Sequence, residues 1–166
     1  PVTFKVYDAS TGNVYPAVET SDDVTFVTNS VVGSMNNPFI WNAKDLLEQS
    51  INMNRGWNWN SIYVQPESNA VEDIFAPIAS IVEIAKDKEA YAMYGNRQWR
   101  GDLDEINVGK MYKVKMRRAT TLSVVGEKVD PAAEVVKVKS GWNWIGYTAS
   151  FNMSIADAFA DLNPQD

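Results

Sequence analysis

The chain has 166 residues, with 15 Lys and Arg against 21 Asp and Glu, and it contains neither His nor Cys. Their absence excludes a Ser-His-Asp or Cys-His nucleophile, thiolate chemistry, zinc held by His or Cys, and a disulfide framework. A net charge of −6 argues against nucleic-acid binding, which needs a basic surface. No apolar run reaches the roughly 18 residues of a membrane span, so no membrane insertion is expected.

The first 45 residues predict a small β segment that differs in character from the rest of the chain. Apolar residues alternate with polar ones, and turn residues separate them. Strands are expected near residues 4–7, 24–27 and 39–41, with turns at residues 8–13 and 33–38. Good helix formers around Leu46 and Leu47 predict a helical connection over residues 43–51.

The tetrapeptide Gly-Trp-Asn-Trp occurs twice, at residues 56–59 and 141–144. Because Trp is rare, a match that contains two of them indicates an internal repeat. Each copy is followed by apolar residues at i, i+3, i+4 and i+7, which predicts a short amphipathic helix. These residues are Val71, Ile74, Phe75 and Ile78 in the first copy, and Ile155, Ala158, Phe159 and Leu162 in the second.

Helix boundaries are predicted for both copies from capping and breaking residues. Capping-box spacing marks each start, and a proline limits each helix to two or three turns. The capping pairs are Asn69 with Glu72 and Ser154 with Asp157, and the prolines are Pro77 and Pro164. Between the copies the pattern predicts strands at residues 80–86, 89–94, 113–117, 120–125 and 135–139.

These patterns predict an α+β fold that is mainly β, with antiparallel sheets and short helices. The N-terminal β segment takes residues 1–45, a complete strand-helix-strands repeat unit takes residues 52–139, and a half-repeat takes residues 140–166. A strand with one short helix cannot bury both of its faces. The half-repeat is therefore expected to pack on the preceding unit.

The paired tryptophans admit two interpretations. Alternation places Trp57 and Trp59 on one face of a strand and Asn58 and Asn60 on the other. The tryptophans would form either a platform for sugar rings or part of the core. We expect both pairs in a common core, because Trp buries a large area and dominates packing. Asn58 and Asn143 would then point outward or satisfy backbone groups of a loop.

The tryptophan motif, the short helix and further positions resemble a known repeat. The further positions are Tyr91–Tyr94, Trp99–Gly101, Leu103, Ile106, Gly109 and Tyr112, and in the N-terminal segment Phe4–Gly12, Val32–Ser34 and Asn37–Pro38. The chain resembles the GWNWIS-type repeat module of large secreted or surface proteins of gram-negative gut bacteria, preceded by its usual N-terminal β segment. Asn60 departs from this repeat, which usually has an apolar residue there, as Ile145 is in the second copy. The resemblance implies an extracellular or cell-surface location and neighbouring domains in a longer polypeptide, but no chemistry.

A polar loop between glycines is the predicted ligand-binding site. Aromatic residues beside Arg, Gln and Asn on a loop are typical of surfaces that contact glycans or peptides. The predicted ligand-binding residues are Tyr94, Arg97, Gln98, Trp99 and Arg100. The alternative is that Trp99 is a hairpin aromatic that folds onto its own sheet.

Three clusters of charged residues are candidate sites for a cation or an anion. Two of them carry oxygen ligands of the kind that Ca²⁺ prefers, but neither has the twelve-residue calcium-loop pattern, and turns with Asx-type hydrogen bonds explain both. They comprise Asp102, Asp104, Glu105 and Asn107, and Asp8, Ser10, Gly12 and Asn13. No metal or cofactor is therefore expected. A basic stretch predicts a solvated strand face or a contact with an acidic polysaccharide, and it contains Lys110, Lys113, Lys115, Arg117 and Arg118.

Only carboxylates remain for catalysis, and no feature of the sequence selects a pair of them, so no enzyme activity is expected. We expect a non-catalytic module of an exported or cell-surface protein that binds carbohydrate or mediates adhesion. The alternative is a structural spacer or assembly module with no small ligand. The expected partners are a glycan and the neighbouring domains.

Overall fold

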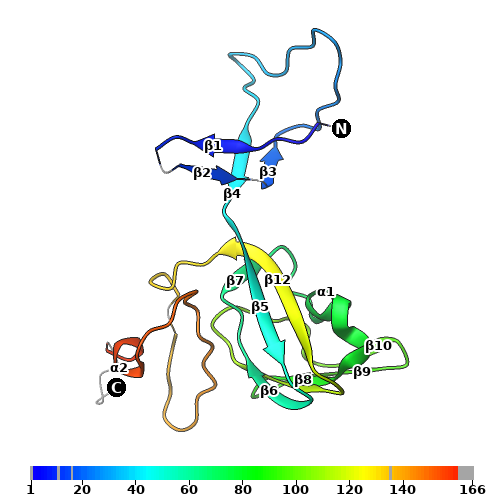
Figure 1. Ribbon diagram of the computed structural model, residues 1–166, viewed down its shortest axis with the longest axis vertical. Helices are drawn as coiled ribbons and strands as arrows, with labels where there is room; N and C mark the ends of the chain where they lie inside the picture. The colour runs from blue at the N-terminus through cyan, green and yellow to red at the C-terminus, as the bar shows by residue number, and fades with distance from the viewer. Residues whose placement is uncertain (1, 11, 16, 135, 161–166) are drawn as a thin grey trace.

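The computed structural model describes residues 2–10, 12–15, 17–134 and 136–160. This part of the chain is mainly β, with four antiparallel sheets and short helices, which confirms the predicted fold class. Figure 1 shows the first four strands at one end of the molecule and the C-terminal residues beside the two larger sheets.

The N-terminal segment forms two small antiparallel sheets. Strand β1 (Val6–Asp8) pairs with β2 (Asn13–Tyr15), and β3 (Ala17–Thr20) pairs with β4 (Trp41–Lys44). A cluster of aromatic rings holds the ends of the segment together. The centroid of Trp41 lies 5.1 Å from that of Phe4 and 6.1 Å from that of Phe39. The predicted strand at residues 24–27 is not formed.

Lys44 links the N-terminal segment to the larger sheets. Its Nζ lies 2.6 Å from a carboxylate oxygen of Glu19 on β3 and 3.3 Å from one of Glu127. Hydrogen bonds to Glu19 and Glu127 raise the pKa of Lys44. Because both glutamate side chains are more than half exposed, the two ion pairs add little to stability.

The predicted helical connection over residues 43–51 is wrong. These residues belong to β4 and to β5 (Leu46–Met53), which pairs along its length with β12 (Thr120–Lys128). The other side of β12 pairs with β7 (Val64–Pro66), which gives a three-stranded sheet in the order β5-β12-β7. Pairing with β12 and the burial of alternate side chains outweigh the helix propensity of this stretch.

The second large sheet has five strands in the order β10-β9-β8-β11-β6, all antiparallel. Its strands are β6 (Gly56–Asn60), β8 (Val82–Lys86), β9 (Tyr91–Gly95), β10 (Gln98–Gly101) and β11 (Tyr112–Met116). The predicted strands at 80–86, 89–94, 113–117 and 120–125 are thus confirmed to within a few residues. Asn96 and Arg97 have φ of 52° and 61°, the left-handed conformation that a two-residue hairpin turn needs.

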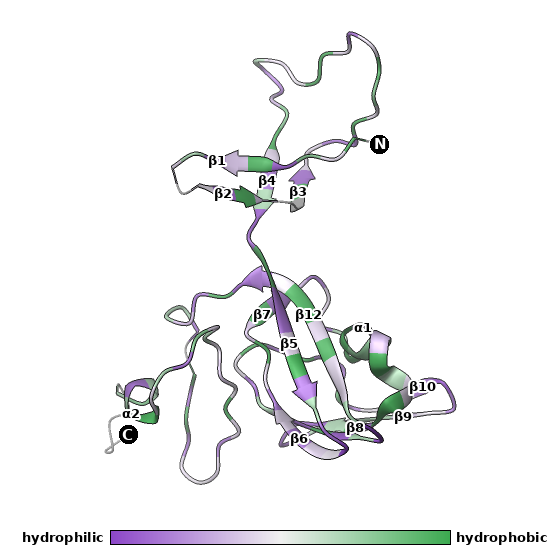
Figure 2. Ribbon diagram, in the orientation of Figure 1, coloured by the Kyte–Doolittle hydropathy of each residue, from purple (hydrophilic) through white to green (hydrophobic). Residues whose placement is uncertain are grey.

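A short helix closes the side of the two sheets. It consists of α1 (Val71–Phe75) and a 3₁₀ turn, η1 (Ala76–Ile81). The four residues predicted to face the core, Val71, Ile74, Phe75 and Ile78, are all buried. Figure 2 shows α1 beside the hydrophobic stretches of β5 and β12. The predicted capping box at Asn69 and Glu72 is wrong, since Ala70 occupies the N-cap and no side chain caps it.

The core lies between the two large sheets and under α1. Its largest fully buried side chains are Tyr112, Met116, Val64, Val82 and Val114. Tyr112 is the polar member of this group, and its hydroxyl accepts a hydrogen bond of 2.8 Å from the backbone N–H of Asn107. Burial raises the pKa of Tyr112, because the phenolate would have to lie among apolar side chains.

The C-terminal residues do not repeat the strand of the first copy. Residues 141–144 form no strand, and neither do residues 136–139 of the predicted strand at 135–139, while Val135 lies outside the described residues. Contacts with the preceding unit come from residues 142–149, where Ala149 is buried.

The capping of α2 (Ile155–Ala158) by Ser154 is as predicted. Its apolar side is nevertheless exposed, with Ile155 at 80%; Leu162 and Pro164 lie outside the described residues.

Candidate ligand-binding face

The tryptophans of the first copy lie on the outer face of the five-stranded sheet. Trp57 and Trp59 share one face of β6, as predicted, but they are 50% and 62% exposed, and Trp142 of the second copy is 89% exposed. The prediction that both pairs lie in a common core is therefore wrong. Large exposed aromatic side chains that gather on one surface are typical of a binding site.

Asn58 explains why the tryptophans point outward. Its Oδ1 accepts a hydrogen bond from the N–H of Asn54 at 2.8 Å, and its Nδ2 donates to the carbonyl oxygens of Asn54 and Gly56 at 2.7 and 3.0 Å. These bonds close the tight turn that leads into β6, in which Gly56 has a φ of 91°. Because neighbouring side chains alternate along a strand, an inward amide at Asn58 fixes Trp57 and Trp59 on the other face.

The second copy has the same turn. Asn143 accepts a hydrogen bond from the N–H of Lys139 at 3.0 Å and donates to the carbonyl oxygens of Lys139 and Gly141 at 2.7 and 3.1 Å. Gly141 has a φ of 93°, close to that of Gly56. Of the two positions expected for Asn58 and Asn143, outward or bonded to loop backbone groups, the structure shows the second, although the buried tryptophans that this expectation assumed are not found. The motif builds an asparagine-closed turn that presents its tryptophans to solvent.

Lysine side chains lie beside the tryptophans on the same face. In the register of the sheet, Trp59 on β6 is opposite Lys113 on β11, which is opposite Lys86 on β8. Lys113 Nζ lies 4.1 Å from the ring centroid of Trp59 and 5.1 Å from that of Trp144. The two indoles are 6.1 Å apart. We call this group, Trp57, Trp59, Lys86, Lys113 and Trp144, the Trp–Lys face.

Trp144 reaches this face because the second copy is anchored to the first. Ser61 Oγ accepts a hydrogen bond from the N–H of Tyr147 at 3.1 Å, and Lys88 Nζ donates to the carbonyl oxygen of Trp142 at 3.0 Å. The N–H of Gly146 donates to the carbonyl oxygen of Gly109 at 2.9 Å. A Cβ at Gly146 would lie 2.4 Å from the carbonyl oxygen of Lys110, so this approach needs glycine.

The lysines of β8 and β11 differ in their partners. Lys115 Nζ lies 2.8 Å from a carboxylate oxygen of Glu83, and this hydrogen bond lowers the pKa of Glu83. Lys86 and Lys113 form no ion pair with any other described residue. Two like charges on neighbouring strands repel each other. The Trp–Lys face is therefore a positive patch on a chain of net charge −6.

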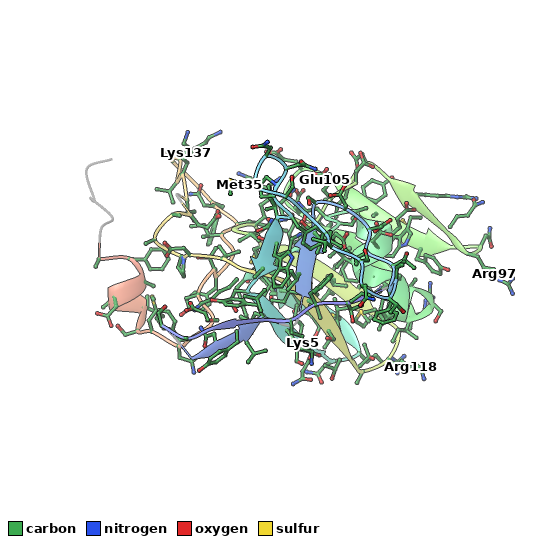
Figure 3. The ribbon with its side chains drawn as sticks, turned by 90° about the horizontal axis from the view of Figure 1, so that it is seen from above. Lys5, Met35, Arg97, Glu105, Arg118 and Lys137 are labelled. Carbon is green, nitrogen blue, oxygen red and sulfur yellow. The ribbon has the colours of Figure 1, made fainter. Side chains whose placement is uncertain are left out.

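The residues predicted as a ligand site around the β9–β10 hairpin are divided between two faces. The ring of Trp99 lies 5.2 Å from that of Tyr94 and 5.8 Å from that of Phe75 on α1, on the inner face of the sheet. The polar residues Arg97, Gln98 and Arg100 are exposed. Figure 3 shows Arg97 at the outer end of the hairpin, pointing away from the molecule. The structure thus brings Trp99 and Tyr94 together and leaves the polar members apart from them.

The acidic clusters form turns and strand ends. Asp8 accepts hydrogen bonds from the N–H and hydroxyl of Ser10, the Asx-type turn that the sequence predicts. Asp102 Oδ1 accepts from the N–H of Tyr91 at 2.9 Å. Within the described ranges, no group of three or more Asp and Glu residues is placed to hold a metal ion.

Asn60 on β6 has a buried amide group that lowers the stability of the fold, and this gives a testable prediction. Its Nδ2 is buried and has no hydrogen-bond partner in the described part of the chain, beside apolar side chains such as Ile62 and Ile74. We expect Asn60→Ile to raise the free energy of unfolding by about 1–2 kcal/mol, because a buried unpaired amide is removed. Urea unfolding measures the change. Asn58→Ile is the matched control and should destabilise the protein, since it removes the bonds that close the turn.

The sequence alone did not identify the Trp–Lys face as one site. Alternation predicts which residues of β6 and which of β11 share a face. It does not predict that β11 pairs with both β6 and β8, or that Trp144 lies beside Trp59. No protein-family model, curated protein or solved structure matches this chain. Among the described residues, no helix is both long and apolar enough to cross a membrane.

Proposed function

We propose that this protein is a non-catalytic module that binds carbohydrate, and that it belongs to an exported or cell-surface protein. The observation that carries the proposal is the outward position of Trp57 and Trp59 on β6, with Trp144 beside Trp59. An indole ring offers a flat apolar surface on which the C–H face of a pyranose ring packs. A sheet holds such rings at fixed spacing without a conformational change.

The repeat resemblance supports the proposed location, and the pair of asparagine-closed turns supports a duplicated unit. Both copies of the motif present tryptophan side chains to solvent. Trp142 of the second copy is more exposed than Trp57 and Trp59 of the first. A polypeptide with several such units would bind a polymer at several points, and this increases avidity without new contacts. Adhesion to a glycan-bearing surface follows from this arrangement.

The first test is a binding prediction for Trp59→Ala. We expect this variant to lose affinity for its glycan by roughly 30-fold or more, because truncation of a central tryptophan of a binding surface costs about 2 kcal/mol or more. A glycan array identifies the ligand, and affinity electrophoresis compares the variants. Phe26→Ala is the matched control, since Phe26 is 80% exposed and lies in the N-terminal segment. Equal binding by both variants would contradict the proposed site.

A structural spacer or assembly module is the second candidate. It is favoured by the apolar residues that the C-terminal segment leaves uncovered, among them Ile155 and Phe159 of the α2 region. In this case the exposed apolar side is covered by a neighbouring domain of the same polypeptide. This candidate predicts that no glycan shifts the melting temperature, whereas the binding module predicts a rise with ligand concentration.

A further inference from the structure

The Trp–Lys face continues as a row across the sheet. Trp59, Lys113, Lys86 and Tyr91 lie opposite one another on β6, β11, β8 and β9, and all four point away from the core. Adjacent strands are about 4.8 Å apart, so the row brings aromatic rings and ammonium groups within the length of a short oligosaccharide. The row therefore offers both an apolar surface and positive charge to one extended ligand.

The charge of this row is not neutralised by the protein. Lys86 and Lys113 are cross-strand neighbours. Within the described part of the chain, the ion pairs involve Lys44, Lys110 and Lys115, and neither Lys86 nor Lys113. Two acidic residues next to this row are paired with other lysines, Glu83 with Lys115 at 2.8 Å and Asp87 with Lys110 at 4.0 Å. Two facing lysines destabilise a sheet by their repulsion. An anion bound between them would remove this repulsion.

We propose that the Trp–Lys face binds an acidic polysaccharide built from uronic acids. This inference rests on the proposed carbohydrate binding and names its ligand class. In a uronic acid the carboxylate is attached directly to the sugar ring, so a ring stacked on Trp59 holds its charge close to that ring. Lys113 Nζ, 4.1 Å from the centroid of Trp59 and 5.1 Å from that of Trp144, lies where such a carboxylate is reached.

The indoles supply affinity for a sugar ring, and the lysines select a ligand that carries a carboxylate. The C–H face of the sugar packs on the indoles of Trp59 and Trp144, and the carboxylate accepts charge-assisted hydrogen bonds from Lys113 and Lys86. A sulfate ester places its charge farther from the ring than a carboxylate does. Neutral sugars leave both ammonium groups without an anion. The geometry thus favours polyuronates over sulfated and neutral polysaccharides.

The test is affinity electrophoresis of the full chain in gels that contain polygalacturonate, alginate, methyl-esterified pectin or heparin. We expect retardation by at least one polyuronate, weaker at high salt because salt screens exposed charges. The double variant Lys86→Gln/Lys113→Gln should lose at least tenfold in affinity. Lys113→Arg should keep most of it. Lys5→Gln, on the N-terminal segment, is the control and should bind normally.

Each other outcome overturns the inference. If neutral glycans bind and Trp59→Ala abolishes this binding while the lysine variants bind normally, the proposed function stands and the acidic ligand is wrong. If heparin binds more tightly than every polyuronate, the ligand is a sulfated glycan. If no glycan binds the native protein, both the proposed function and this inference fail. Circular dichroism of each variant confirms that it is folded.

Discussion

Replacing Phe75 with alanine is expected to lower the free energy of unfolding by about 3–5 kcal/mol, measured by urea denaturation. Phe75 is 3% exposed at the end of α1, and its ring contacts that of Trp99 on β10. Truncation removes the apolar area of the ring and leaves a cavity between the helix and the outer strands of the sheet. The rest of α1 cannot fill it, because the 3₁₀ turn that follows α1, with Pro77 near its start, fixes the direction of the chain.

A substitution of Trp99, the β10 residue that Phe75 contacts, tests how strongly the β9–β10 hairpin packs on α1. Trp99→Ala should also destabilise the protein, and the coupling energy in a double-mutant cycle with Phe75→Ala should be about 0.5–1.5 kcal/mol. Phe26→Ala, at an 80% exposed position, should change stability by less than about 0.5 kcal/mol. If Trp99→Ala abolishes glycan binding and leaves stability unchanged, the ligand site lies at the hairpin and not on the Trp–Lys face.

The parts of the fold that the sequence predicted are those with a strong local period. The spacing of Val71, Ile74, Phe75 and Ile78 identified the helix and its buried side. Alternation identified β11 in the same way. The prediction of a helix over residues 43–51 is wrong, because β5 forms by pairing with β12, more than 60 residues along the chain. Local propensity carries no information about such a partner.

The site could be predicted only in part, for a related reason. Alternation shows that Trp57 and Trp59 share a face, but the direction of that face depends on what the other face can bury. The amide of Asn58 is needed by the turn at residues 54–56, and this need outweighs the larger apolar area of the indoles. The second copy has the same turn, but its residues 141–144 belong to no strand. Its tryptophans are placed by the bridge between Ile145 and Lys110 and by the contacts of Ser61 and Gly109 with Tyr147 and Gly146.

Gln49→Leu is expected to destabilise the protein by about 2–4 kcal/mol, although leucine has nearly the same size. Gln49 is a buried polar residue, 5% exposed, on β5. Its Nε2 donates to the carbonyl oxygen of Ser61 at 2.9 Å, and its Oε1 accepts from the N–H of Tyr63 at 2.8 Å. Leucine would leave both backbone groups without these partners. Gln65→Leu is the matched control, because Gln65 is exposed on β7.

Gln49→Glu distinguishes the contribution of the hydrogen bonds to stability from that of packing. Only the hydrogen bonds depend on the protonation of the introduced acid, and therefore on pH. The protonated acid both donates to Ser61 and accepts from Tyr63, whereas the carboxylate repels the carbonyl oxygen of Ser61. The folded state thus raises the pKa of the introduced acid. The contribution of its two hydrogen bonds to the free energy of unfolding is therefore present at low pH and is lost as pH rises. Since Ser61 also anchors Tyr147, loss of this support should loosen Trp144 beside Trp59 and weaken glycan binding together with stability. A variant that is destabilised equally at every pH would show that Gln49 acts through packing alone.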